Sequence, residues 1–191
     1  MALKTLVKVG NIANLSDARY CAGMGVDLLG FTAIEGQPSY ISLKLYQDIR
    51  GWVAGPAVVL ELYGLKDGGS LPRLLEDYRP DYLEVGMEEL DLIPDSLDQP
   101  LIVSIHSTED LSRIQRRNKM IRYVIINEDR IDVIRKAELF DVILSLHSTS
   151  GLQLLDELPL KGVALNGSPE LRPGYKDYGD LAEVLEKLEI D

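Results

Sequence analysis

The chain has 191 residues, 46% hydrophobic and 27% charged, which is enough to bury one substantial core. Its formal net charge of −11 repels phosphate backbones and anionic membrane surfaces, so we expect no nucleic acid and no membrane as partners. A single cysteine, Cys21, excludes an intrachain disulfide. The opening run is too short for a secretory signal and no run of about 18 apolar residues could span a bilayer, so we expect a cytoplasmic protein.

Short apolar runs rich in β-branched residues recur along the chain between segments with helical spacing. They predict eight strands, at about Thr5 to Gly10, Val26 to Phe31, Ala57 to Tyr63, Tyr82 to Val85, Leu101 to His106, Tyr123 to Asn127, Val142 to His147 and Gly162 to Asn166.

Hydroxyl residues mark the starts of several predicted helices. Ser16 followed by Asp17 is typical of an N-cap and a first-turn acid, for a helix that ends near Gly23 to Gly25. Ser42 precedes another helical segment, and Ser107 opens the helix after the fifth strand.

Strands that alternate with helices imply parallel strands joined by right-handed crossovers. Eight such units predict an α/β fold, a compact (β/α)8 TIM barrel that takes up residues 1–191 as a single domain. An open doubly wound sheet is the structural alternative. No glycine-rich nucleotide loop follows any predicted strand, so we expect no nucleotide cofactor.

In such a barrel the functional site forms at the carboxyl ends of the strands. Both histidines, His106 and His147, close predicted strands two units apart, where histidine can act as acid, base or phosphate partner. Polar residues also gather at strand ends simply because the backbone meets water there, and both interpretations stay open. The polar residues at the predicted strand ends are Lys8, Asn11, Glu61, Glu84, His106, Asn127, Glu128, His147 and Asn166.

Lys8 lies between Val7 and Val9 in an apolar strand, and a buried lysine needs an acidic partner. We expect Glu61 or Glu84 to supply it. Glu84 or Glu128 could add a third ligand to the histidines, but no ligand spacing specifies a metal, and we predict none.

The junction Asn166-Gly167-Ser168 follows the last predicted strand. Small residues there let backbone amides approach an anion, and barrels often bind phosphate after their last two strands. We therefore predict a weak phosphate site at this junction.

Five segments, taken in order, resemble the phosphoribosylanthranilate isomerase family in sequence and spacing. The most specific are Lys8 to Ile12 (KVGNI) and Glu170 to Asp177 (ELRPGYKD); between them lie 16–18 (SDA), 25–31 (GVDLLGF) and 38–42 (PSYIS). The resemblance covers essentially the whole chain, although the middle is matched mainly by the rhythm of its strands. It implies a (β/α)8 barrel that catalyses an Amadori rearrangement, an aldose-to-ketose isomerisation in tryptophan biosynthesis, without cofactor or metal.

The resemblance also implies that the catalytic residues are replaced. The reaction needs an acid at the ring oxygen and a base at the second sugar carbon. The family's cysteine base matches Gly10, its aspartate acid matches Asn127, and the arginine that grips the anthranilate carboxylate matches Ser39. Serine cannot replace the charge-assisted contact of a bidentate arginine.

Two further family motifs are altered in the same alignment. The glutamine and histidine of the family's fourth strand match Glu84 and Gly86, and its Gly-Gly-Leu phosphate loop matches Ser145-Leu146-His147. Direct contact of His147 with a phosphate would compensate for the altered loop.

Three functions therefore stay open. The first is an isomerase-like barrel whose family activity is lost or strongly reduced. The second is an altered sugar-phosphate isomerase or lyase that uses His106, His147 and a glutamate such as Glu84 or Glu128. The third is a non-catalytic barrel that binds a metabolite or a protein. A small phosphorylated sugar-like metabolite is the expected partner, held by Ser39, Ser145, His147, Asn166, Gly167 and Ser168, in a monomer or homodimer.

Overall fold

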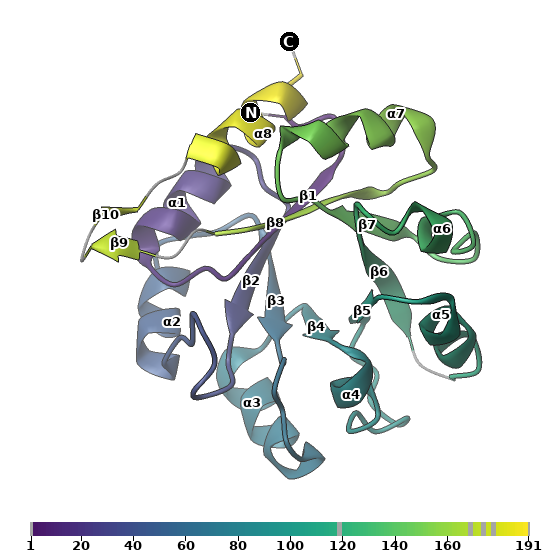
Figure 1. Cartoon of the computed structure of the whole chain (residues 1–191). Coiled ribbons are helices and arrows are strands. Elements are labelled where there is room, and N and C mark those ends of the chain that lie inside the picture. The colour runs from purple at the N-terminus through teal and green to yellow at the C-terminus, as the bar shows by residue number, and fades with distance from the viewer. Residues whose placement is uncertain (1, 118–119, 168–169, 173–174, 177–178, 191) are drawn as a thin grey trace.

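Eight parallel strands form a closed barrel in the order β1 to β8, with helices around it (Figure 1). The computed structural model describes residues 2–117, 120–167, 170–172, 175–176 and 179–190. The closed barrel confirms the predicted fold and rules out the open sheet. The strands are β1 (Leu6–Gly10), β2 (Leu28–Thr32), β3 (Ala57–Glu61), β4 (Tyr82–Val85), β5 (Leu101–Ile105), β6 (Ile121–Asn127), β7 (Val142–Ser145) and β8 (Gly162–Asn166).

The crossovers are compact, which is how so short a chain completes a barrel. Three of the helices have only four residues each. The helices are α1 (Leu15–Gly23), α2 (Leu43–Arg50), α3 (Leu71–Tyr78), α4 (Met87–Leu90), α5 (Thr108–Gln115), α6 (Ile131–Ile134), α7 (Leu154–Glu157) and α8 (Gly179–Leu188), with 3-10 turns η1 (Gly68–Ser70) and η2 (Thr149–Gln153).

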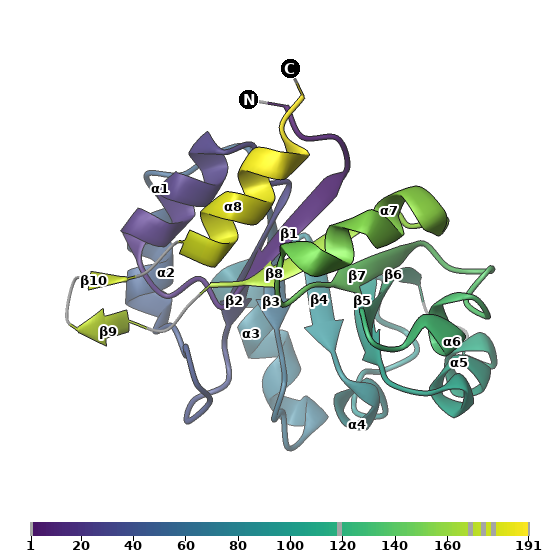
Figure 2. The ribbon, with the colours of Figure 1, turned by 45° about the horizontal axis from the view of Figure 1, so that its top comes forward.

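A small antiparallel ribbon, β9 (Glu170–Arg172) with β10 (Tyr175–Lys176), connects β8 to α8 and lies at the outer edge of the molecule near α1 (Figures 1 and 2). It contains part of the segment 170–177; Pro173, Gly174 and Asp177 lie outside the described residues. The two ends of the chain meet, since Leu3 pairs with Glu189.

Several predicted strand boundaries are wrong by one or two residues, for local reasons. The strand predicted from Val26 begins at Leu28, because the Val26 N–H closes the end of α1 by donating to the Cys21 carbonyl. β5 ends before His106, whose N–H donates to the Asp110 carboxylate at 3.0 Å instead of extending the sheet. β7 ends at Ser145, two residues before His147.

The caps explain where the helices begin. The prediction of Ser16 as an N-cap is wrong: α1 begins at Leu15, and Asn14 caps it by accepting the Asp17 N–H at 2.9 Å. Ser42 caps α2 as predicted. Ser107 caps α5 within a capping box, in which Asp110 accepts the Ser107 N–H at 3.0 Å.

We expect Ser107→Ala to lower the free energy of unfolding by about 1 kcal/mol, because the Asp110 N–H loses its acceptor and the capping box is halved. Urea denaturation measures this change. Ser112→Ala, at an exposed position inside the same helix, is the control and should cost nothing, since alanine is the better helix former. Equal costs for the two substitutions would show that the cap contributes no stability.

The core has two parts. The larger lies between the strands and the helices, and the smaller lies inside the barrel. Successive inward residues of a strand are two apart, so the inner layer of Val59, Ile102, Ile143 and Ala164 is followed toward the carboxyl ends by a polar layer. That polar layer contains Glu61, Ser104, Ser145 and Asn166.

None of the helices in the described ranges is both long enough and apolar enough to cross a membrane.

Candidate functional site

A cavity of about 230 Å³ opens at the carboxyl ends of the strands, above the apolar inner layer. We call it the mouth cavity. Most of its lining residues are polar, and they lie on, or directly after, every strand of the barrel except β2. Its lining residues are Lys8, Asn11, Glu61, Tyr63, Glu84, Ser104, Ile125, Ser145, Ala164 and Asn166.

An ionic cluster of Lys8, Glu61 and Glu84 forms one wall of this cavity, and all three side chains are at most 5% exposed. Lys8 Nζ lies 2.7 Å from Glu61 Oε1 and 2.8 Å from Glu84 Oε2. The predicted acidic partner of Lys8 is therefore both glutamates at once. A lysine between two carboxylates stays protonated, so it cannot serve as a neutral amine nucleophile.

The two carboxylates are held differently. Besides Lys8, Glu61 accepts the Asn11 N–H at 3.2 Å and the Thr32 hydroxyl at 3.0 Å, both on Oε2. Glu84 accepts the Tyr63 hydroxyl at 2.8 Å on Oε1, and its Oε2 is ion-paired with Lys8 Nζ at 2.8 Å. Besides Lys8, Glu61 is thus held by two donors and Glu84 by one.

Burial and neighbouring charge shift the pKa values within the cluster. Burial alone would lower the pKa of Lys8, but the carboxylates of Glu61 and Glu84 outweigh it and raise that pKa. Burial and the Glu61 charge raise the pKa of Glu84 despite the opposing effect of Lys8. Burial and the Glu84 carboxylate raise the pKa of Tyr63 well above its usual value. Glu84 therefore retains its proton to a higher pH than an exposed glutamate.

We expect the raised pKa of Glu84 to make the folded chain lose stability as the pH rises. The folded state holds this proton above the usual value of 4.5, where the unfolded chain releases it. This contribution is fully present below that value and is lost as the pH rises through the folded pKa. Glu84→Gln removes it, so the stability of wild type relative to E84Q should fall as the pH rises above 4.5. Urea denaturation at several pH values below and above 4.5 checks the trend; a difference independent of pH would contradict it.

Two glycines make room for the Glu61 carboxylate. A Cβ atom on Gly10 would lie 2.5 Å from Glu61 Oε1 and 2.9 Å from Lys8 Nζ. A Cβ atom on Gly30 would lie 2.2 Å from the same Glu61 oxygen. Carbon atoms do not approach oxygen this closely, so the ionic cluster takes up the space that any side chain at position 10 would need.

Asn11, which lines the mouth cavity, and Ser39, which does not, both adopt left-handed backbone conformations. Asn11, directly after Gly10, has φ of 57°, and Ser39, in the turn after β2, has φ of 63°. Asparagine tolerates this region better than most residues, whereas serine adopts it less readily. Ser39 is half-buried and is not among the residues that line the mouth cavity.

The histidines lie at the rim rather than in the cavity. His106 and His147 are exposed, neither lines the mouth cavity, and no hydrogen bond joins their side chains in the described part of the chain. His147 Nε2 lies 3.1 Å from Asn127 Nδ2. The other side-chain atom of Asn127, Oδ1, is buried without a hydrogen-bond partner. The structure therefore brings His147 to Asn127 and leaves His106 apart.

The residues predicted to hold phosphate are only partly grouped. Ser145 and Asn166 line the mouth cavity, on neighbouring strands. The Gly167 N–H already donates to the Gly10 carbonyl at 2.9 Å, so it is not open to an anion. Ser168 lies outside the described residues. A phosphate site at this junction stays a prediction.

Sequence reasoning missed Tyr63 and Ser104 as cavity residues, and Thr32 as a partner of Glu61. The period of two that defines the inner face would have found the first two, because Tyr63 follows Glu61 and Ser104 follows Ile102 at that interval. Thr32 ends β2 two residues after Gly30 and is found by the same count.

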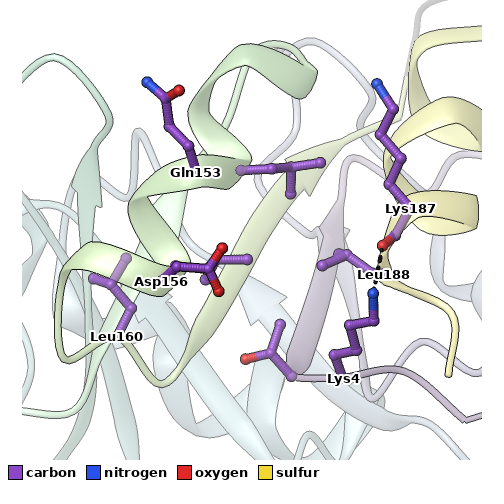
Figure 3. A pocket seen from close by; sticks show the side chains of 9 residues that line it. Lys4, Gln153, Asp156, Leu160, Lys187 and Leu188 are labelled. Atoms are coloured by element: carbon purple, nitrogen blue, oxygen red, sulfur yellow. Dashed lines mark hydrogen bonds between the residues drawn. The ribbon is translucent and has the colours of Figure 1, made fainter.

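A second hollow of about 460 Å³ lies outside the barrel, between the η2–α7 segment and the end of α8. Figure 3 shows Asp156 on one wall and Lys4 with Lys187 on the other. Lys4 Nζ donates to the Lys187 carbonyl, and Lys187 Nζ is paired with Glu183. Both ammonium groups of this hollow thus have partners. The hollow lies by the start of β1, away from the carboxyl ends of the strands.

Across the residues that the structure describes, no three His, Cys, Asp or Glu side chains come together to hold a metal ion.

The fold and the mouth cavity together define a (β/α)8 barrel with an ion-paired polar layer at the carboxyl ends of its strands. No protein family model matches the chain, and neither does any curated protein. Solved structures do match, and among them are phosphoribosylanthranilate isomerases.

The isomerase from Thermus thermophilus is 17% identical, with 96% of this chain and 98% of that one covered and a TM-score of 0.75. The isomerase from Pyrococcus furiosus is 16% identical over the same shares, also with a TM-score of 0.75. An isomerase in complex with reduced 1-(o-carboxyphenylamino)-1-deoxyribulose 5-phosphate is 18% identical over 95% of this chain and 97% of that one, with a TM-score of 0.73. At such identities the likeness establishes the fold.

Proposed function

We propose that this chain is a phosphoribosylanthranilate isomerase-like barrel in which the family reaction is lost or strongly reduced. The proposal rests above all on Gly10, the position matched to the family's base. A cysteine there would need the space that the Glu61 carboxylate and Lys8 Nζ occupy. Without a proton acceptor at that position the second sugar carbon keeps its proton, and loss of an essential base typically costs about 10² to 10⁴ in rate.

The charge of the mouth cavity supports the same proposal. The single basic residue of the cavity, Lys8, is already paired with two carboxylates. Neither the phosphate nor the carboxylate of an anthranilate-linked ribose phosphate would find an unpaired cation among the lining residues.

The second candidate is an altered enzyme that moves a proton with Glu84. The observation that favours it is the position of this carboxyl group, which lines the cavity, is nearly buried and has a raised pKa. A mechanism that uses both histidines has less support, since His106 and His147 lie outside the cavity.

Growth of a bacterial strain that lacks its isomerase tests the proposal. Expression of this chain should not restore growth without tryptophan, whereas a genuine isomerase expressed at the same level should. The Gly10→Cys variant should also fail, because Glu61 and Lys8 occupy the space of its side chain. Growth with the wild-type chain as fast as with the genuine isomerase would refute the proposed loss.

A further inference from the structure

We propose that the amino-terminal end of the barrel, beside the starts of β6 and β7, binds an acidic segment of another protein that also presents apolar side chains. The surface concerned, which we call the amino-end patch, consists of Arg116, Met120, Arg122, Arg135, Lys136 and Leu139. This inference goes beyond the proposed loss of the isomerase reaction and does not depend on it, because the patch and the mouth cavity lie at opposite ends of the strands.

Two neighbouring loops form the amino-end patch. One loop follows α5 and leads into β6, and the other follows α6 and leads into β7. The helices α5 and α6 lie side by side on the same flank of the barrel (Figures 1 and 2). Arg122 Nη1 lies 3.1 Å from Asp141 Oδ2, so a salt bridge joins the start of β6 to the residue before β7. The two loops therefore contribute to one surface.

Two large apolar side chains are exposed in this patch. Leu139 is 80% exposed and Met120 is 57% exposed. Val124 pairs with Val142 in the parallel sheet, and Met120 and Leu139 lie four and three residues before this pair, so both are at the same level of the barrel. Apolar side chains exposed together are typical of interaction sites, and methionine and arginine are both enriched in protein interfaces.

The same surface is basic in a chain that is otherwise acidic. Residues 113–136 contain eight basic and three acidic side chains, whereas the rest of the chain contains 12 basic and 28 acidic ones. Arg116, Arg135 and Lys136 are exposed and form no salt bridge with any residue in the described part of the chain. Glu138 is exposed in the same loop as Lys136. The unpaired cations outnumber it, so charge complementarity selects an acidic partner.

The combination of charge and apolar surface favours another protein over a second copy of this chain or a nucleic acid. Two copies that met patch to patch in a symmetric dimer would place their unpaired cations opposite one another. A nucleic acid would pair the cations with phosphates but would set Met120 and Leu139 against a charged backbone. An acidic segment with apolar side chains pairs with the cations and covers both apolar side chains.

Selection from a random library of 12-residue peptides displayed on phage, with the purified chain immobilised, tests this inference. We expect the enriched peptides to contain more Asp and Glu than the starting library, together with apolar residues. The best of them should bind the chain in solution with a Kd of about 10 to 100 μM. Binding should weaken as the salt concentration rises, because salt screens the charge pairs.

Variants locate the binding surface. The double variant Lys136→Glu/Leu139→Ser should weaken binding of the best peptide at least about tenfold, because it reverses one charge and removes one apolar contact. Lys44→Glu/Leu45→Ser is the matched control: it makes the same two changes at exposed positions on α2, across the barrel, and should bind like wild type. Arg116→Glu, on the other loop, should also weaken binding and tests the patch if the double variant fails to fold.

Several outcomes would overturn the inference. They are failure to enrich any peptide, enriched peptides without an excess of acidic residues, and equal affinities of wild type and K136E/L139S. Sedimentation equilibrium would point to a second copy instead if wild type forms a dimer that K136E/L139S abolishes. A single-stranded oligonucleotide that binds the patch as tightly as the best peptide would point to a nucleic acid, and either result contradicts the proposed partner.

Discussion

Lys8→Met is expected to lower the free energy of unfolding by about 3 to 5 kcal/mol, because it leaves two carboxylates buried without their cation. Glu61 and Glu84 lie 2.7 Å and 2.8 Å from Lys8 Nζ, and both are at most 5% exposed. Glu61 keeps hydrogen bonds from Asn11 and Thr32, but Glu84 keeps only the Tyr63 hydroxyl. Methionine fills much of the space of the lysine stem, so the change measures the charge rather than a cavity.

Urea denaturation of wild type and K8M at several pH values measures this effect. The loss should shrink as the pH falls toward 4, because protonated carboxyl groups no longer need the cation. Lys66→Met, at an exposed lysine just after β3, is the control and should change stability by less than about 0.5 kcal/mol. A cost for K8M as small as that of K66M would show that the cluster is not a stabilising ion pair.

Gly10→Cys is expected to lower the free energy of unfolding by about 1 to 3 kcal/mol, because the new side chain overlaps the Glu61 carboxylate. Its Cβ would lie 2.5 Å from Glu61 Oε1 and 2.9 Å from Asn166 Oδ1. Gly23→Cys is the matched control, since a Cβ there meets no atom within 4 Å.

A double-mutant cycle with Glu61→Ala isolates the overlap. If Glu61 causes the cost of G10C, that cost should be smaller by at least about 1 kcal/mol in the E61A background. An unchanged cost of G10C in E61A would mean that Glu61 does not occupy the space of a side chain at position 10.

The barrel itself could be predicted from the sequence, because parallel strands covered on both faces are nearly continuous apolar runs. Runs such as 57–61 and 101–105 end where the structure turns polar, which places the site at the correct end of the barrel. The N-caps Ser42 and Ser107 could also be predicted, since each accepts an N–H of the first helical turn. Ser16 is not the N-cap of α1, because Asn14, two residues earlier, accepts the Asp17 N–H instead.

The arrangement of side chains in the site could be predicted less well from the sequence. A strand boundary shifted by one or two residues moves a side chain from the cavity to the rim. His106 and His147 therefore lie outside the cavity, although the sequence pattern predicts that both close a strand. Lys8 clearly needed an acidic partner, but only the register of β3 and β4 places Glu61 beside Glu84 and brings both to the same ammonium group. A side chain at position 10 would overlap the Glu61 carboxylate, which is 51 residues further along the chain, so only the three-dimensional structure shows this overlap.

Turnover of phosphoribosylanthranilate by the purified chain tests the proposed loss of isomerase activity most directly. Enzymes typically turn over at about 1 to 10³ per second, and loss of the base alone removes about 10² to 10⁴ of that rate. We predict a rate at least about 10²-fold below that of a genuine isomerase measured alongside, both for wild type and for G10C. A rate for wild type equal to that of the genuine isomerase would contradict the account, because it would require a base that the ionic cluster at Gly10 excludes.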